Sequence, residues 1–190
     1  MENEIRLRYG ATRLGVPDGT AITLLHIGNE QTAVAIGTGS DPDAILALAI
    51  GSNRTAADFF KHAPPMPSEL ENAIMVVEDE VTRLRSITAT ASTLFTSDLA
   101  IREIALVAGV SGSPELILTL DAVELTFDKL ATLRFGRPAS SAGIPANAAF
   151  AATLLILREF MHHLQFASIV LRPDSPRSSP SVAGHYSSQT

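Results

Sequence analysis

The residues best suited to chemistry form one short polar segment, Gly51–Thr55, which follows the apolar run Ala44–Ile50. If the run is a strand and a helix follows it, the segment presents backbone amides and the positive end of a helix dipole to a bound anion. Arg54 would clamp the anion, and Ser52 and Asn53 would add polar side chains. The segment therefore predicts a site for a small anionic or phosphorylated ligand.

The same residues have a plainer interpretation. Ser52, Asn53 or Thr55 can serve only as the cap of a helix, which is the commonest role of such residues at a helix start. The segment lacks the lysine and the full spacing of a Walker loop, and the chain lacks the Gly-x-Gly-x-x-Gly fingerprint, so no nucleotide is predicted. His62, which precedes a proline-rich break, or Glu159 would act as the acid or base on the same ligand.

A second group of candidates lies near the end of a long apolar segment, where Glu159, His162 and His163 occur together. A Glu-x-x-His pair places both side chains on one helix face and is a ligand spacing of di-iron bundles, but those sites need two such pairs. Only one pair occurs here, so no metal site is predicted. His26 is flanked by Leu25 and Ile27 and reads as a hydrogen-bonded residue of a strand.

Ala49-Ile50-Gly51-Ser52-Asn53 resembles a loop of actin-like phosphatases. The resemblance covers five residues and lacks the strand that should follow, so it assigns the chain to no family. The chain has no cysteine and no Gly-x-Ser-x-Gly elbow, which removes thiolate chemistry and the nucleophile of α/β-hydrolases.

Composition excludes further classes of function. The 190 residues are 46% hydrophobic and 18% charged, and the net charge of −6 has the wrong sign for neutralising phosphates along a nucleic acid. The most apolar stretch, Ala146–Leu157, is about half of the roughly 20 residues that cross a bilayer. We therefore expect a cytoplasmic protein that binds neither nucleic acid nor membrane.

The hydrophobic periods predict strands first and helices afterwards. A strand over 5–9 rests on the alternation of Ile5, Leu7 and Tyr9 with arginines, and a hairpin follows over 20–36. The run 44–50 is predicted as a strand in preference to a helix. Helices are expected over 56–61, 67–84, 98–108, 114–135 and 145–171, and 86–97 gives no decisive period.

This order predicts an α+β fold, with a small N-terminal antiparallel sheet followed by four or five packed helices. Residues 1–171 would form a single domain, and 172–190 a flexible tail rich in serine and proline. The helix predicted over 145–171 is apolar on nearly every face in its first half, so we expect it to be covered in a symmetric homodimer.

Two functions follow from these observations. The main interpretation is a non-catalytic assembly, accessory or regulatory module that acts as a helix-mediated homo-oligomer, because no acid, base and nucleophile converge. The alternative is an enzyme or sensor that binds a small anionic or phosphorylated ligand. The residues predicted to bind it are Gly51, Ser52, Asn53, Arg54, Thr55 and His62. Neither a catalytic residue nor a cofactor is predicted, and whether the chain is an enzyme stays open.

Overall fold

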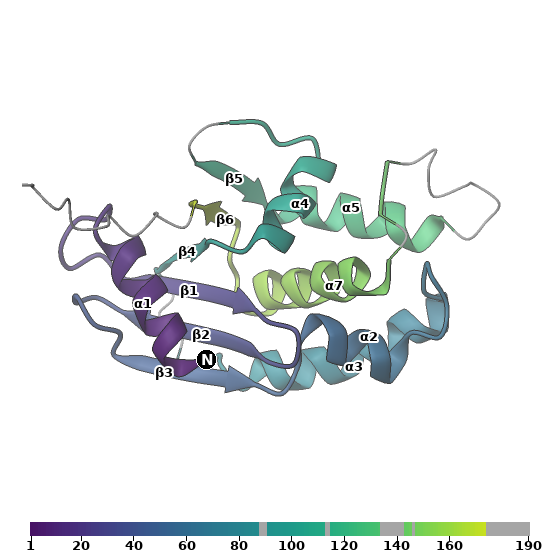
Figure 1. Cartoon of the computed structure of the whole chain (residues 1–190), viewed down its shortest axis with the longest axis horizontal. Coiled ribbons are helices and arrows are strands. Elements are labelled where there is room, and N and C mark those ends of the chain that lie inside the picture. Colours follow the sequence, from purple (N-terminus) through teal and green to yellow (C-terminus); the bar gives the residue numbers. More distant parts are fainter. Residues whose placement is uncertain (88–90, 113–114, 134–142, 146, 174–190) are drawn as a thin grey trace, which may run out of the picture.

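The structure is a computed structural model of the whole chain and describes residues 1–87, 91–112, 115–133, 143–145 and 147–173. This part has six strands in one mixed sheet and six helices (Figure 1). The helices are α1 (Glu2–Arg13), α2 (Ser52–Phe59), α3 (Pro67–Thr82), α4 (Leu99–Val107), α5 (Leu120–Thr132) and α7 (Ala148–His163). The strands are β1 (Ile22–Ile27), β2 (Thr32–Gly37), β3 (Ala44–Leu48), β4 (Thr93–Thr96), β5 (Leu116–Thr119) and β6 (Ser168–Leu171). The predicted α+β class is confirmed.

The strand order is β3-β2-β1-β4-β6-β5. The predicted antiparallel sheet is one part of it, since β1 pairs with β2, and β2 with β3, in antiparallel fashion. The sequence did not predict the other half, where β4 is parallel to both β1 and β6. It follows that β1, β3, β4 and β6 run in one direction. Their carboxyl ends lie along the same side of the sheet, which we call the carboxyl edge.

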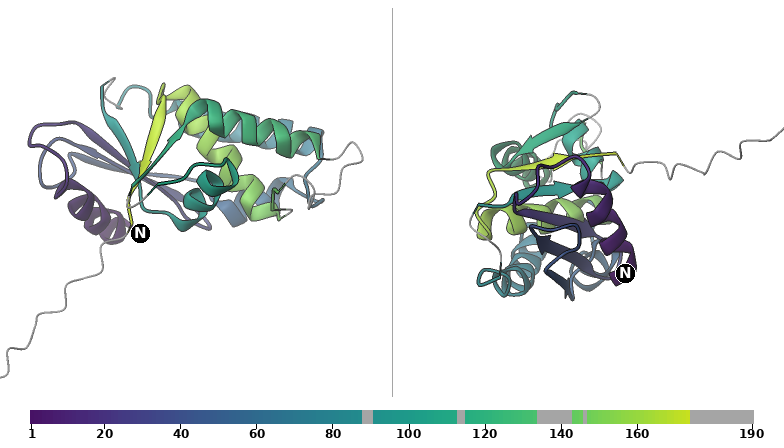
Figure 2. Two further views of the ribbon diagram at one scale, coloured as in Figure 1. Left: turned by 90° about the horizontal axis from the view of Figure 1, so that it is seen from above. Right: turned by 90° about the vertical axis from the view of Figure 1, so that its left-hand side faces the viewer.

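Helices cover both faces of the sheet, which explains why β1 and β2 are continuously apolar. Leu25 and Ile27 of β1 belong to the larger core, which the helices α2, α3, α4, α5 and α7 complete. Ile22 and Leu24 point to the other face and pack with Ile5 and Tyr9 of α1. Figure 2 shows α1 beside the β1–β3 half of the sheet, with the other helices gathered toward the opposite end of the molecule.

Helix α7 lies in the middle of the larger core. Its residues Phe150 to Leu157 are all buried, and α2, α3, α4 and α5 pack around it. The apolar surface from which we inferred a homodimer is therefore covered within the chain. The dimer stays a prediction, but this surface no longer supplies the reason for it.

The strand predicted over 5–9 is wrong, because these residues belong to α1. The buried residues of the segment are Ile5 and Tyr9, four positions apart, while Leu7 between them is 66% exposed. A spacing of four marks one face of a helix. The pairs Arg6–Glu2 and Arg8–Glu4 also lie four apart and stabilise the helix surface.

The helix predicted over 114–135 is in fact a strand followed by a helix. In β5, Leu116 and Leu118 are buried, while Ile117 is exposed. This alternation is typical of a strand with one buried and one exposed face. Thr119 then caps α5, because its side chain accepts a hydrogen bond from the Ala122 amide. We read the four-residue spacing of the leucines as a helix and missed the cap between them.

The helix predicted over 145–171 ends at His163, and the chain continues into β6. Gln165 adopts a positive φ of 61°, and the Phe166 amide donates to the Met161 carbonyl at 2.8 Å, so the helix stops in a left-handed turn without glycine. Strand β6 then enters the sheet between β4 and β5. Residues 86–97, which had no decisive period, contain β4, although 88–90 lie outside the described residues.

The remaining predicted elements can also be checked. The hairpin over 20–36 is confirmed as β1 and β2. The run 44–50 is extended, as predicted, but β3 lies at the edge of the sheet and most of its residues are only half-buried. The helices predicted at 67 and 98 are confirmed as α3 and α4, and the helix predicted over 56–61 begins earlier, at Ser52.

Most of the predicted tail, 174–190, lies outside the described residues. Arg172, which we assigned to the tail, is tied to the domain. Its backbone amide donates to the Thr96 carbonyl and its side chain pairs with Glu115 at 2.6 Å. Among the described residues, no helix has the length and apolar character needed to span a membrane.

Candidate functional site

A cavity of about 200 Å³ lies where three helices begin at the carboxyl edge, and we call it the helix-start pocket. Its walls come from the β1–β2 turn and from the first turns of α2, α4 and α7, helices far apart in the sequence. The lining residues are Asn29, Ser52, Asn53, Ala100, Glu103, Asn147, Ala149, Phe150 and Thr153. Ligands in open α/β sheets bind outside the carboxyl ends of the strands, so this position favours a functional site.

The first turn of α2 does not present free amides, contrary to our expectation for segment 51–55. The Ser52 amide donates to the Gly28 carbonyl at 2.9 Å, and the amides of Asn53 and Arg54 both donate to the Asn29 carbonyl at 3.0 Å. A Cβ atom on Gly51 would lie 2.5 Å from that same carbonyl oxygen, so only glycine allows this close approach. The β1–β2 turn thus occupies the donors on which our prediction depended.

The first turns of α4 and α7 offer donors in their place. No described residue accepts a hydrogen bond from the amides of Ala100 or Ala149, both of which line the pocket. Asn147 caps α7 by accepting from the Phe150 amide. Two helix starts with unpaired amides and several neutral polar side chains favour a small anion. Glu103 is exposed and is the acidic residue of the lining.

The structure brings together only part of the predicted site. Ser52 and Asn53 line the helix-start pocket, while Arg54, Thr55, Gly51 and His62 do not. Arg54 lies 3.8 Å from Asp58 in an exposed pair, and Thr55 is buried.

His62 pairs instead with Glu69 at 2.8 Å, and the same carboxyl group accepts from the Met66 and Lys61 amides. The Met66 hydrogen bond is the main cause that lowers the pKa of Glu69 from 4.5 to about 2, with the His62 and Lys61 contacts adding to it. His62 therefore helps to fix the start of α3.

This contact predicts a pH-dependent effect of Glu69→Gln. Because the pKa of Glu69 is lower in the folded chain, its ionised form stabilises the fold. The contribution is complete above about pH 4.5 and is lost as the pH falls toward about 2. We expect the stability difference between wild type and variant to be constant above pH 5 and to shrink below it, as measured by urea unfolding. Glu71→Gln, on the same helix, is the control. A pH-independent difference contradicts the assignment.

A second cluster at the carboxyl edge joins α1, β1 and the start of α4. Asp98 is only 6% exposed; its Oδ1 accepts from His26 Nδ1 at 2.5 Å and from Arg8 at 3.0 Å, and its Oδ2 from the Ile27 amide at 2.7 Å. Arg8 also binds Glu4 at 2.8 Å. Three donors thus hold the buried carboxylate.

These contacts fix the proton of the His26 ring. A carboxylate that accepts from Nδ1 selects the tautomer with the proton on Nδ1, and in the neutral ring Nε2 is then the acceptor. Nε2 lies 3.7 Å from the place a Cβ on Gly28 would take, beside the turn whose next residue, Asn29, lines the helix-start pocket. A histidine oriented by a carboxylate is the arrangement of a general base.

Sequence reasoning missed this cluster for an identifiable reason. We took His26 as a wall residue because it stands in a strand, and we took Asp98 only as a helix start. The parallel pairing of β1 with β4 brings the two together, and that pairing was not predicted. No local pattern marks it.

Glu159, His162 and His163 do not form a metal site. Glu159 is buried and contacts Arg158 and His163, the latter at 3.1 Å, whereas His162 lies 3.4 Å from Glu124. The Glu159–His163 contact spans four positions, and the predicted partner at three positions points elsewhere. Within the part of the chain that the structure describes, no three His, Asp or Glu side chains are arranged to hold a metal ion.

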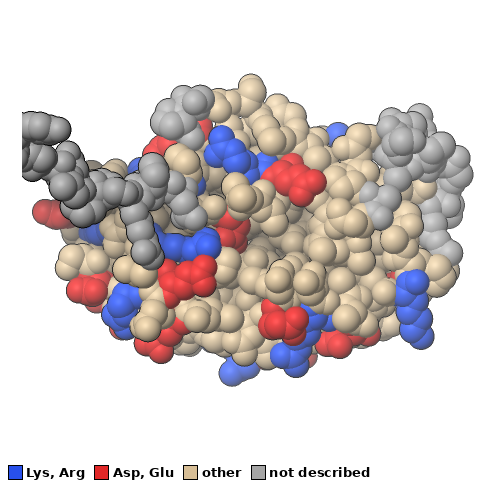
Figure 3. Space-filling model, in the orientation of Figure 1, with Lys and Arg blue, Asp and Glu red and all other residues tan. Residues whose placement is uncertain are grey.

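The charges on the surface are mixed. On the face in Figure 3, acidic and basic side chains alternate, and the described residues there form no continuous basic stripe. That the chain does not bind nucleic acid stays a prediction.

Comparison with known proteins gives similarity at the level of structure. No protein-family model matches the sequence, and no curated protein matches it. Two solved structures of Ppx/GppA proteins from Aquifex aeolicus, the first titled as a phosphatase of the type II variant, each give a TM-score of 0.71, with 17% and 18% identity. The structure of an exopolyphosphatase from Cytophaga hutchinsonii gives a TM-score of 0.69 with 14% sequence identity.

These similarities cover most of this chain but only part of the others. The matches to the Aquifex structures cover 87% of this chain, and 57% and 56% of those chains. The match to the Cytophaga enzyme covers 90% of this chain and 58% of that one. At these identities the comparison establishes the shared fold.

The comparison contradicts our main interpretation, a non-catalytic module that acts through a helix surface. The fold is that of proteins described as phosphatases and exopolyphosphatases. The apolar helix that suggested such a surface lies inside the molecule as α7. The alternative interpretation, a binder of phosphorylated ligands, agrees better with both observations.

Proposed function

We propose that this protein is a phosphatase-like enzyme that binds the phosphoryl group of a small molecule in the helix-start pocket. The observation that carries the proposal is the meeting of three helix starts at one cavity on the carboxyl edge, two of them with unpaired amides. Its volume of about 200 Å³ is several times the roughly 30 Å³ that a water molecule takes in the liquid. The shared fold with phosphatases supports the same ligand class.

The amides of Ala100 and Ala149 and the side chains of Ser52 and Asn53 would bind the phosphoryl oxygens. This set of donors includes Ser52 and Asn53, which were predicted from the sequence. The backbone amides at the helix starts take the role that we had predicted for Arg54. Neutral donors at helix starts bind phosphate well because the dipoles add to the hydrogen bonds.

His26 is the candidate general base in this proposal; it stands on the α1 side of the sheet, next to the turn that carries Asn29, and does not itself line the helix-start pocket. A water molecule attacks phosphorus and its proton passes to Nε2 of His26. The bond from phosphorus to the leaving oxygen breaks, and that oxygen takes a proton from solvent. Asp98 holds the ring in the required tautomer and stabilises the imidazolium that forms. The cytoplasmic location stays part of the proposal.

Ala100→Asp tests the binding site. A carboxylate in the first turn of α4 suits the helix dipole, so the fold is retained, but in the pocket it repels phosphate. We expect the Kd for inorganic phosphate, measured by calorimetry, to rise at least tenfold. Leu99→Asp is the matched control, because Leu99 is the neighbouring residue, is 81% exposed and lies outside the pocket. It should leave the Kd within about threefold.

Two outcomes decide against this version of the site. If both aspartate variants weaken phosphate binding equally, the effect is a long-range charge effect and the pocket is not the site. If Ala100→Asp has no effect while Arg54→Ala abolishes binding, the ligand binds at the segment predicted from the sequence. Hydrolysis of p-nitrophenyl phosphate by the wild-type chain tests the enzymatic part.

A further inference from the structure

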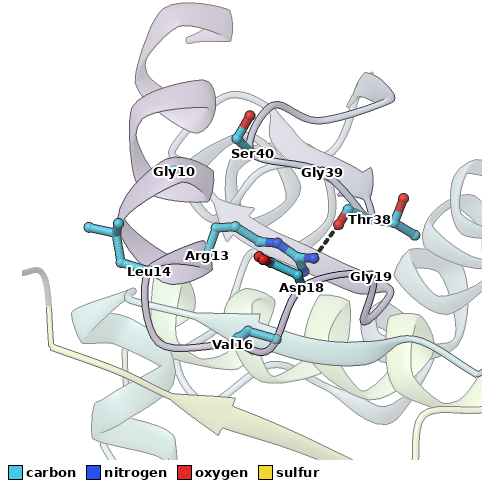
Figure 4. A pocket seen from close by; sticks show the side chains of 9 residues that line it. All are labelled: Gly10, Arg13, Leu14, Val16, Asp18, Gly19, Thr38, Gly39 and Ser40. Atoms are coloured by element: carbon cyan, nitrogen blue, oxygen red, sulfur yellow. Dashed lines mark hydrogen bonds between the residues drawn. The ribbon is translucent and has the colours of Figure 1, made fainter.

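A second and larger cavity, of about 460 Å³, lies at the edge of the sheet opposite to the carboxyl edge. It is bounded by the end of α1, the loop that leads into β1 and the loop that follows β2. We call it the Arg13 pocket, and Figure 4 shows the residues that line it. They are Gly10, Arg13, Leu14, Val16, Asp18, Gly19, Thr38, Gly39 and Ser40.

Arg13 is the unusual feature of this pocket. It is only 8% exposed, and its guanidinium donates to the Thr20 carbonyl at 2.5 Å and to the Thr38 carbonyl. Among the described residues, no carboxylate lies within 4.0 Å of it. A guanidinium carries more N–H donors than these two carbonyls use, and a buried charge without a counter-charge is costly. Arg13 therefore has both donors and charge available for an acidic ligand group.

Asp18 supplies the opposite charge in the same cavity. Figure 4 shows its carboxylate on the side of Arg13 away from Ser40. Asp18 is the acidic residue of the lining, and Arg13 is the basic one. A simple anion such as phosphate would meet repulsion from Asp18, whereas a ligand with one group of each sign would satisfy both side chains. Val16 adds apolar surface to the lining, whereas Leu14 is 92% exposed and its side chain points away from the charged pair (Figure 4).

Glycines keep the cavity open. Gly10 stands inside α1, where glycine costs about 1 kcal/mol relative to alanine, yet a Cβ there would meet no atom within 4 Å. Close packing of the described atoms therefore does not explain why position 10 is a glycine. Gly19, with φ of 78°, also has open space around the position of a Cβ. Both glycines border the pocket, so larger residues would project into it.

We propose that the Arg13 pocket binds a free α-amino acid with an apolar side chain. The carboxylate pairs with Arg13, the ammonium group pairs with Asp18, and the side chain packs on Val16. Ser40 lines the same cavity on the side of Arg13 opposite to Asp18. The site is separate from the helix-start pocket, because Thr20 precedes β1 and Thr38 follows β2, at the opposite edge of the sheet. This proposal therefore stands or fails independently of the proposed function.

The test is calorimetric titration of the full chain with L-leucine, 4-methylpentanoate and 3-methylbutylamine. These three probes carry both charged groups, the carboxylate alone and the ammonium alone. We expect L-leucine to bind with a Kd of about 1 mM or lower and the other two at least tenfold more weakly. Inorganic phosphate should not compete. Equal binding of leucine and 4-methylpentanoate, competition by phosphate, or no binding of leucine at about 10 mM overturns the proposal.

Variants locate the site. Gly10→Leu places a side chain in the cavity without meeting described atoms at its Cβ, and should abolish leucine binding. Ala11→Leu is its control, since Ala11 is exposed on the same helix and lies outside the lining. Asp18→Asn should raise the Kd at least tenfold, and Asp41→Asn, an exposed residue outside the lining, should not. Retained binding in Gly10→Leu, with native circular dichroism, overturns the location.

Discussion

Replacing Phe160 with alanine is expected to lower the free energy of unfolding by about 3–5 kcal/mol. Phe160 is fully buried on α7, and its ring stacks on Phe166 with centroids 6.0 Å apart. The substitution removes apolar area and leaves a cavity that the surrounding helices cannot close, because α7 is packed on several sides. Urea unfolding followed by circular dichroism measures the change.

Leu106→Ala is the matched control for this prediction. Leu106 is 60% exposed on α4, so truncating it should change the free energy of unfolding by less than about 0.5 kcal/mol. If Phe160→Ala destabilises the chain no more than Leu106→Ala does, α7 is not the central helix of the core.

Replacing Asp98 is expected to have the second large effect, and two substitutions separate its causes. Asp98→Ala leaves the buried Ile27 amide without an acceptor and removes one of the two carboxylates that bind Arg8, so the free energy of unfolding should fall by about 3 kcal/mol. Asp98→Asn keeps an oxygen for one of these donors and should cost about 1–2 kcal/mol.

Asp98→Asn also tests the role of His26. An amide side chain can donate to Nδ1, which favours the tautomer with the proton on Nε2 and removes the free acceptor. If the proposed phosphatase activity is present, kcat should fall about 100-fold while the Kd for phosphate stays within threefold. A nitrogen-15 spectrum of His26 reports the change of tautomer directly. Unchanged kcat together with a changed tautomer means that His26 is not the base.

The sequence was sufficient where a local pattern decides the structure. The hairpin β1–β2 follows from two β-branched runs around a turn, and α3 follows from Pro67 and a four-three spacing of apolar residues. The α+β class also follows from these periods, but the predicted order does not hold, since α1 precedes the sheet and β4, β5 and β6 alternate with helices. The prediction that 44–50 is extended was also correct, because it too rested on a local pattern, a continuous apolar run.

The sequence was insufficient where tertiary pairing decides. Leu116 and Leu118 occupy a strand because β6 offers them a partner, and β6 lies more than 50 residues later in the chain. The candidate site has the same origin, since Ala100, Ala149 and Asn29 contribute mainly backbone or neutral groups that no motif marks. Ser52 and Asn53 were found because their polar types stand directly after an apolar run. Arg54 was wrongly predicted to bind the anion. Its charge can be read from the sequence, but the direction of its side chain depends on α2, which leaves it exposed beside Asp58.

The place of β6 in the sheet has a consequence for synthesis on the ribosome. It is the last described strand along the chain, yet it fills an interior slot between β4 and β5. A nascent chain that has emerged only as far as α7 still lacks this central partner, so β4 exposes one unpaired side and β5 has no strand to pair with. Synthesis of β6, rather than emergence of the early hairpin, therefore sets the moment at which the sheet can close.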